Sequence, residues 1–230
     1  QNIDKVTFMN NIPETVLNKS TKEFETNANA WDVSAQQDKS IVAWYNSNEV
    51  SNGTYKVYIG SDSEIFANRD STNLFRYVGY STQCASTDTI SKINLLNTAS
   101  VINMNYMFRY TGTNAMTKLD LGNNFSTSNV TSMEAMFGDT GFEKMTTLNL
   151  GANFDTSKVT NMSVMFWNCG NKVMTSLNLG SKFNTANVTT MDYMFRETGK
   201  MSMTTLNLGS QFDTIKVTNM KSMFQGTGYT

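Results

Sequence analysis

Few residues in this sequence could carry catalytic chemistry, and their types and spacing exclude most catalytic designs. The chain contains no histidine, which excludes Ser-His-Asp and Cys-His catalysis and the HExxH type of zinc site. Its two cysteines, Cys84 and Cys169, lack CxxC spacing, so a zinc site built on them is not expected. No glycine-rich phosphate-binding motif stands between a strand pattern and a helix pattern. The sequence therefore predicts neither a metal nor a cofactor.

Carboxylates are the remaining candidates for catalysis, because a pair of them can hydrolyse a glycosidic bond. Asp120, Asp155 and Asp213, however, stand at repeated positions that other copies fill with asparagine or serine. Hydrogen bonding in turns explains that choice of residues better than acid–base chemistry does. The chain is therefore not expected to be an enzyme.

Two sets of residues have the types and spacing of a binding surface. The first set is two columns of polar residues that recur every 29 positions: Lys118, Thr147, Ser176 and Thr205, and beside them Asp120, Asn149, Asn178 and Asn207. They could present a platform to a protein or a glycan, or they could simply hydrate the face of a sheet. The second set is Trp167, Tyr193 and Arg196, residue types enriched at interface hot spots. The alternative there is a tryptophan tucked against its neighbouring repeat.

The elements that must position these residues come from one phrase written four times. The copies begin at Met116, Met145, Met174 and Met203, a fixed period of 29 residues. A constant period in this range is typical of a solenoid. The apolar positions are the same in every copy while their neighbours vary, which separates the residues that face a core from those that face water.

Within the second copy, the pattern predicts a strand followed by a short helix. Leu148 and Leu150 alternate with polar residues, as in a half-buried strand. Met162, Met165 and Phe166 are spaced i, i+3 and i+4, which places them on one face of a helix. A threonine precedes this helix as a possible cap, and glycine ends it. The expected fold is therefore an α/β solenoid of strand–turn–short-helix coils.

The rest of the chain divides into three parts. Residues 1–30 are expected to be a lead-in or flexible segment, with a short helix near residues 14–25 as an alternative. Residues 31–89 are expected to form an N-terminal α+β cap, with Ser71 as the cap of a helix through Leu74 and Phe75. Residues 90–230 form five repeats, the first of them shortened, and the array is expected to continue beyond residue 230.

Charge and cysteine placement limit the partners. Lys and Arg number 18 against 19 Asp and Glu, with no basic run, so nucleic acid is not an expected partner. No apolar stretch approaches about 18 residues, so no membrane insertion of this segment is expected.

Three rungs of about 4.8 Å separate Cys84 from Cys169 in the expected register, too far for a disulfide. We expect two free thiols and a monomer.

The phrase FDTSKVTNMSVMF at residues 154–166 resembles the BspA-like leucine-rich-repeat bacterial surface proteins, whose motif is also known as the mycoplasma lipoprotein-type repeat. The phrases WDVSAQQDKSIVAWYN and YIGSDSEIFAN are similar to the segment that precedes the repeats in Gram-positive members. The resemblance covers the chain from Trp31 to its end. It implies a leucine-rich-repeat-like, right-handed stack and a secreted or cell-surface bacterial protein, anchored to the cell wall or to lipid outside this segment. It implies no shared catalytic residues.

The function expected from the sequence is non-catalytic protein–protein interaction or adhesion at a bacterial surface. Two alternatives stay open. A carbohydrate-binding surface module is suggested by the aromatic residues Trp167 and Tyr193 near the polar columns. A structural spacer that displays another domain would need no ligand.

Overall fold

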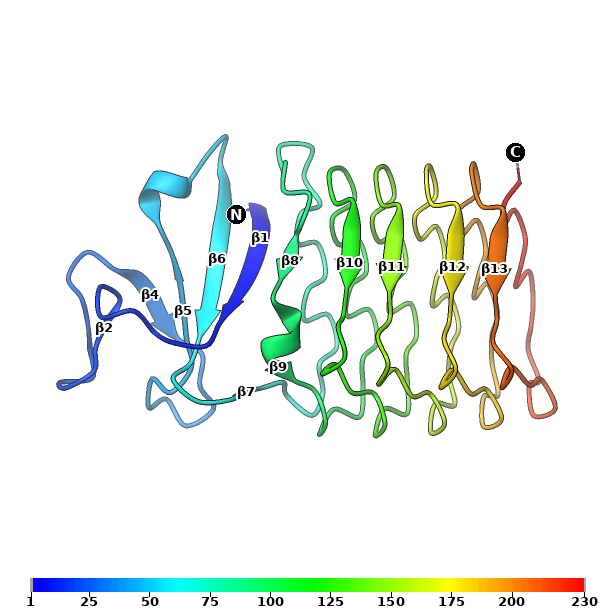
Figure 1. The fold of residues 1–230 in the computed structure, drawn as a ribbon, viewed down its shortest axis with the longest axis horizontal. Coiled ribbons are helices and arrows are strands. Elements are labelled where there is room, and N and C mark those ends of the chain that lie inside the picture. Colours follow the sequence, from blue (N-terminus) through cyan, green and yellow to red (C-terminus); the bar gives the residue numbers. More distant parts are fainter. Residues whose placement is uncertain (1, 230) are drawn as a thin grey trace.

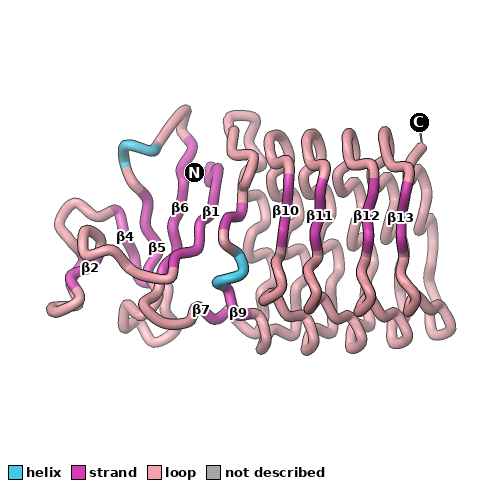
Figure 2. The backbone as a smooth tube through the Cα atoms, in the orientation of Figure 1, coloured by secondary structure: helices cyan, strands magenta, loops and turns pink. Residues whose placement is uncertain are grey.

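A computed structural model describes residues 2–229. A five-stranded sheet at the N-terminal end is followed, along the long axis, by a row of repeats that lie side by side (Figure 1). Turns and loops make up most of the remaining backbone (Figure 2). The strands are β1 (Asn2–Met9), β2 (Leu17–Asn18), β3 (Glu23–Phe24), β4 (Asn29–Asp32), β5 (Val42–Tyr45), β6 (Thr54–Gly60), β7 (Ile65–Phe66), β8 (Ile90–Ser91), β9 (Leu96–Asn97), β10 (Lys118–Asp120), β11 (Thr147–Asn149), β12 (Ser176–Asn178) and β13 (Thr205–Asn207).

The N-terminal sheet has the strand order β4-β5-β6-β1-β8, with β1 parallel to both β6 and β8. Val6 and Phe8 of β1 are buried and alternate with more exposed neighbours, the pattern of a strand with one face on a core. The segment expected as a lead-in thus contributes β1 to the middle of this sheet. The helix considered near residues 14–25 is wrong, because that segment forms a turn and the β2–β3 hairpin. The domain boundaries themselves stay a prediction.

On one side of the repeats, the strands pair in register but only in twos. Leu119 lies opposite Leu148, and Leu177 lies opposite Leu206, in two separate parallel sheets. The glycine after each strand allows the close approach within a pair, since a Cβ at Gly151 would lie 2.0 Å from the carbonyl oxygen of Gly122. We call the outward surface of β10–β13 the strand face.

On the opposite side, the segments expected to be helices form turns. In the second copy the backbone N–H groups of Met162, Val164 and Phe166 donate to the next repeat, to carbonyl oxygens 2.8–3.1 Å away. A helix would direct these donors to carbonyls four residues earlier in the same segment. Val164 and Asn168 adopt φ values of 62° and 56°, which also interrupt a helix. We call the outward surface of these turns, residues 72–77, 105–110, 134–139, 163–168 and 192–197, the turn face.

The predicted fold class is therefore wrong. Within residues 2–229, helix is limited to two three-residue 3-10 turns, η1 (Ser47–Glu49) and η2 (Ile93–Leu95), and the strands form several small separate sheets. The molecule is not an α/β solenoid of leucine-rich-repeat type, and the N-terminal cap has no α-helix among these residues. The i, i+3, i+4 spacing misled the prediction because two consecutive turns bury the same positions that one face of a helix would bury.

Stacked side chains fill the space between the strand face and the turn face. Phe108, Phe137, Phe166 and Phe195 form a column of nearly parallel rings with centroids 5.4–5.5 Å apart. A column of threonines beside them donates hydroxyl hydrogen bonds to phenylalanine carbonyls, as in Thr140 to Phe108, 2.7 Å. Cys169 replaces the threonine in one copy, and both cysteines are buried free thiols. Repetition of contacts from one copy to the next thus stabilises the array.

Candidate binding surface

The two predicted columns of polar residues do lie on the strand face. The asparagine side chains of one column, however, already accept hydrogen bonds from the backbone. Asn149, Asn178 and Asn207 are exposed, and each accepts a hydrogen bond of 3.0–3.1 Å from the N–H of the glycine two residues later. Asp120 does the same with Gly122 at 3.0 Å. Lys118, Thr147, Ser176 and Thr205 are exposed beside them. These bonds support the turn after each strand, which favours the reading of this face as hydrated structure.

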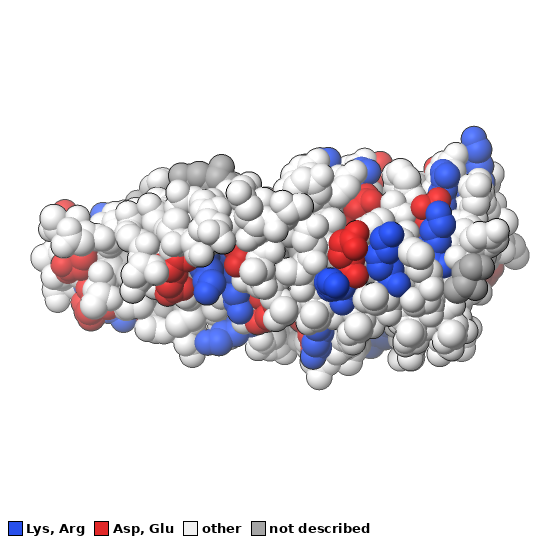
Figure 3. Space-filling model, turned by 90° about the horizontal axis from the view of Figure 1, so that it is seen from above, with Lys and Arg blue, Asp and Glu red and all other residues white. Residues whose placement is uncertain are grey.

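A groove of about 500 Å³ opens at the end of the strand face that adjoins the N-terminal sheet. Lys118 and Asp120 line it together with Asp88 and Lys92. The Nζ of Lys118 lies 2.8 Å from Asp120, and this contact lowers the pKa of the Asp120 carboxyl and raises that of Lys118. The charges of the groove are therefore mixed, and one of its two lysines, Lys118, already has a partner. Seen from above, basic and acidic side chains are likewise interspersed over the repeats (Figure 3).

The second predicted set is brought together on the turn face. The guanidinium of Arg196 lies 5.9 Å from the ring centre of Trp167 and 5.4 Å from that of Tyr193. Lys221 lies 5.8 Å from the Tyr193 ring. The core separates these residues from the strand-face columns, so the aromatic and polar sets do not form one site.

A larger cluster of the same kind occupies the start of the turn face. It comprises Arg76, Tyr77, Tyr80, Tyr106, Arg109 and Tyr110, which we call the Arg–Tyr cluster. The rings of Tyr77 and Tyr110 stack at 5.1 Å with an interplanar angle of 2°, and Tyr80 meets both edge-on. Tyr77 and Tyr80 are each 48% exposed. The stacked tyrosine rings therefore present ordered aromatic surface to solvent.

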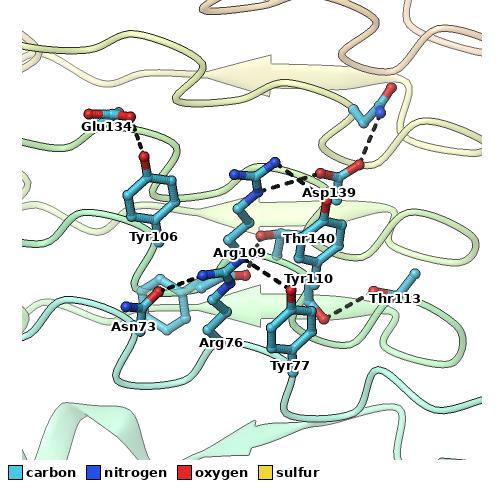
Figure 4. Close-up of polar contacts among 12 residues, drawn as sticks. Asn73, Arg76, Tyr77, Tyr106, Arg109, Tyr110, Thr113, Glu134, Asp139 and Thr140 are labelled. Atoms are coloured by element: carbon cyan, nitrogen blue, oxygen red, sulfur yellow. Dashed lines mark hydrogen bonds and ion pairs between the residues drawn. The ribbon is translucent and has the colours of Figure 1, made fainter.

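Stacking and hydrogen bonds fix the two arginines of the cluster (Figure 4). Arg76 lies 4.8 Å from the centre of the Tyr77 ring, and it donates 3.1 Å bonds to Asn73 Oδ1 and Tyr77 Oη. Arg109 lies 5.0 Å from the centre of the Tyr110 ring. Its Nε is 3.8 Å from Asp139, an ion pair too long to be a hydrogen bond. Both guanidinium groups therefore lie over tyrosine rings, as in cation–π contacts.

Two carboxylates border the cluster. Burial raises the pKa of the Asp139 carboxyl, against the opposing effects of its 3.0 Å bond from Asn168 and of nearby Arg109. The hydroxyl of Tyr106 donates to Glu134, and this bond raises the pKa of Tyr106. The carboxylates hold neighbouring side chains and are not aimed at one another, so the arrangement suits recognition better than acid–base chemistry.

The turn face also holds the buried polar side-chain atoms that lack a hydrogen-bond partner within residues 2–229. They are Arg76 Nε, Arg109 Nε, Asp139 Oδ2, Trp167 Nε1 and Arg196 Nε. Unpaired buried polar atoms cost stability, and folded proteins hold few of them. Three of these atoms still face an opposite charge, since Arg109 Nε lies 3.8 Å from Asp139 Oδ2 and Arg196 Nε lies 4.0 Å from Glu197 Oε1. Among the described residues, Arg76 Nε and Trp167 Nε1 are the two such atoms with neither a hydrogen bond nor an ion pair.

A family model described as "Mycoplasma protein of unknown function, DUF285" matches residues 83–145 and 140–229. The chain belongs to the DUF285 family. No curated protein and no solved structure matches this DUF285 chain.

Among the described residues, no helix has the length and apolar character needed to cross a membrane. Within the same residues, no group of three or more His, Cys, Asp or Glu side chains is placed to hold a metal ion.

The family match begins after Arg76, Tyr77 and Tyr80, so the Arg–Tyr cluster of this DUF285 chain straddles the boundary of the matched region. Sequence reasoning missed the cluster because it expected a helix through Leu74 and Phe75, capped by Ser71, in this segment. The segment LFRYVGY at 74–80 repeats MFRYTGT at 107–113 closely enough to have shown one more turn of the array. Asp70 indeed bridges to Asn103 in parallel register.

Proposed function

We propose that this DUF285 chain is a non-catalytic protein-binding module, and that the Arg–Tyr cluster is its contact surface. The observation that carries the proposal is the pair of guanidinium groups fixed among four tyrosines, two of which are half-exposed. Tyrosine and arginine are enriched at the hot spots that supply most of the energy of protein–protein binding.

Rigidity strengthens the proposal. Ordering a free arginine or tyrosine on binding costs about 0.5–1.5 kcal/mol per side chain. Here the stack of Tyr77 on Tyr110 and the bonds of Arg76 to Asn73 and Tyr77 order the side chains before a partner arrives. A partner would therefore lose little affinity to ordering this surface.

We also propose a localisation and a role: the protein is a secreted or cell-surface bacterial protein of the BspA-like kind, and it acts in adhesion. The DUF285 match and the phrase at residues 154–166 support it.

Binding to an array of extracellular-matrix and plasma proteins tests the proposal. We expect at least one ligand, and we expect the double variant Tyr77→Ala/Tyr80→Ala to weaken its binding at least tenfold, or about 1.4 kcal/mol. Tyr229→Ala is the matched control, because Tyr229 is 72% exposed and lies outside the cluster. An array without signal, or a ligand equally sensitive to both changes, would contradict the proposal.

A further inference from the structure

A second concave site lies far from the Arg–Tyr cluster, at the outer end of the N-terminal sheet. The groove measures about 350 Å³, within the usual range of roughly 300–1,000 Å³ for small-ligand sites. Its lining comes from β4, β5, the loop before β2, the loop before β4 and the turn η1. Its lining residues are Thr15, Val16, Asn27, Ala28, Asn29, Trp44, Tyr45, Asn46, Ser47 and Asn48.

The apolar residues of the groove belong to a fixed core. Val16 and Trp44 are 6% and 4% exposed, in the cluster that also contains Ile12, Leu17 and Val42. The indole of Trp44 stacks on Tyr58 with centroids 5.6 Å apart and planes 18° apart. This side of the groove is therefore preformed and does not need a ligand to order it.

The polar residues are carboxamides and hydroxyls, and no lining residue is charged. Asn27 and Asn48 are exposed, and their carboxamides make no hydrogen bond within residues 2–229. Asn29 and Asn46 donate through Nδ2 to Ser47 Oγ at 2.7 Å and to Glu49 Oε1 at 2.8 Å. Their Oδ1 atoms remain as acceptors. The groove thus offers both donors and acceptors without net charge.

We propose that this groove binds a neutral saccharide. A carboxamide supplies a donor and an acceptor together, which matches sugar hydroxyls that both give and accept hydrogen bonds. Val16 and Trp44 lie beneath the groove, and the half-buried ring of Tyr45 offers an aromatic surface for the C–H face of a sugar ring. The absence of charged lining residues disfavours a phosphate or carboxylate ligand. The proposal is independent of protein binding by the Arg–Tyr cluster, because the two sites share no residue.

Trp44 provides a reporter, because it lies in the buried core directly beneath the groove. The chain has three tryptophans, Trp31, Trp44 and Trp167, so the double variant Trp31→Phe/Trp167→Phe leaves Trp44 alone. The probes are glucose, galactose, mannose, N-acetylglucosamine and disaccharides of each, at millimolar concentrations, with sialic acid as a charged comparison. We expect at least one neutral sugar to change Trp44 fluorescence saturably and to bind by calorimetry, and sialic acid to do neither. Silence of every neutral sugar in both measurements, or binding of sialic acid alone, overturns the proposal.

Two substitutions localise the binding. Asn27→Asp and Asn48→Asp each keep the side-chain shape but remove its donors, and each should weaken the sugar about tenfold, equal to about 1.4 kcal/mol. Asn52→Asp is the control, since Asn52 is an exposed turn residue with φ 51° outside the groove. Thermal unfolding of each variant verifies that it folds. Affinity that is unchanged in both groove variants, or reduced equally by Asn52→Asp, also overturns the proposal.

Discussion

At the scale of single residues, the threonine column shows what one repeated hydrogen bond contributes. Thr111, Thr140 and Thr198 are fully buried, and each donates its hydroxyl to a phenylalanine carbonyl more than one repeat earlier, at 2.7–2.8 Å. Cys169 occupies the same position in the second copy and is equally buried. Because a thiol is a weak donor, this rung lacks the bond that its neighbours have.

Replacing Cys169 with threonine should therefore stabilise the protein. The expected gain in the free energy of unfolding is about 1 kcal/mol, the net value of one such hydrogen bond, measured by urea denaturation. The reverse change, Thr198→Cys, is the matched control and should cost a similar amount. A destabilised Cys169→Thr variant would mean that this rung is too closely packed for the hydroxyl.

Asp139 gives the stability of the chain a defined pH dependence. Burial raises its pKa above the ordinary 3.8, so the folded state binds the proton more tightly than the unfolded state does. The stability that the protonated group contributes is fully present below the unfolded-state pKa, and it is lost as pH rises through the folded-state pKa. The free energy of unfolding of the wild type, relative to Asp139→Asn, should thus fall as pH rises from about 4. Urea titrations across pH measure this difference.

Asp120 supplies the contrasting case for that experiment. Its pKa is lowered, chiefly by the hydrogen bond from Lys118, so its contribution is present above the unfolded-state pKa and is lost as pH falls. The wild type relative to Asp120→Asn should therefore lose stability on acidification. If the Asp139 difference also rose with pH, the assignment of a raised pKa would be wrong.

At the scale of elements, the sequence predicts which side chains are buried better than it predicts the backbone that buries them. The alternation around Leu148 correctly indicates β11, and Met162, Met165 and Phe166 are fully buried as expected. The helix was wrong because periodicity alone does not say where the N–H groups donate. In these turns every second backbone N–H group donates to the next repeat. The positions of neighbouring repeats in space determine this bonding, and the sequence pattern does not contain them.

The binding surface illustrates the same limit. Trp167, Tyr193 and Arg196 could be grouped from their shared position in the repeat, and the structure does bring them together. The contact of Arg76 with Tyr106 crosses from an unrecognised turn of the array to the shortened repeat. The groove around Trp44 joins segments with no repeat between them, so no spacing in the sequence could have indicated it.

The turns carry a measurable strain at Val164. A β-branched residue with φ 62° is a backbone outlier, and such conformations cost about 1–3 kcal/mol. At the equivalent position the first turn of the array has Asn73, with φ 63°, and Asn168 adopts the same left-handed region four residues after Val164. Val164→Asn should therefore raise the free energy of unfolding by about 1 kcal/mol, since asparagine tolerates this conformation.

Val188→Asn is the control for that change. Val188 is fully buried and is not among the residues with positive φ, so the same substitution should cost about 3 kcal/mol through cavity formation and an unpaired amide. Urea denaturation of both variants gives the comparison. Equal losses at the two positions would show that Val164 is held by packing and carries no backbone strain.

At the scale of the whole molecule, the N-terminal sheet and the repeats are joined by shared hydrogen bonds. β1 pairs with β8, and the carboxylate of Asp4 accepts bonds of 2.9 Å from the N–H groups of Ala85 and Ser86. The N–H of Gly79 donates to Ile3 at 2.7 Å. These bonds attach the sheet directly to the turns that carry Tyr77 and Tyr80, so the Arg–Tyr cluster is presented at a fixed position on the molecule.

Because the turn segments of each repeat bond to those of its neighbours through equivalent atoms, removing one whole copy should leave a foldable chain. Deletion of residues 174–202 brings β11 next to β13 and keeps both the Arg–Tyr cluster and the Asp139–Asn168 bond. Deletion of only residues 174–188 would instead place turn residues against strand residues and expose apolar side chains. We expect the first variant to unfold in one transition with a smaller urea m-value, because less surface is buried, and to keep any ligand of the cluster. The second should aggregate, and equal behaviour of the two deletions would show that the array depends on more than contacts between adjacent copies.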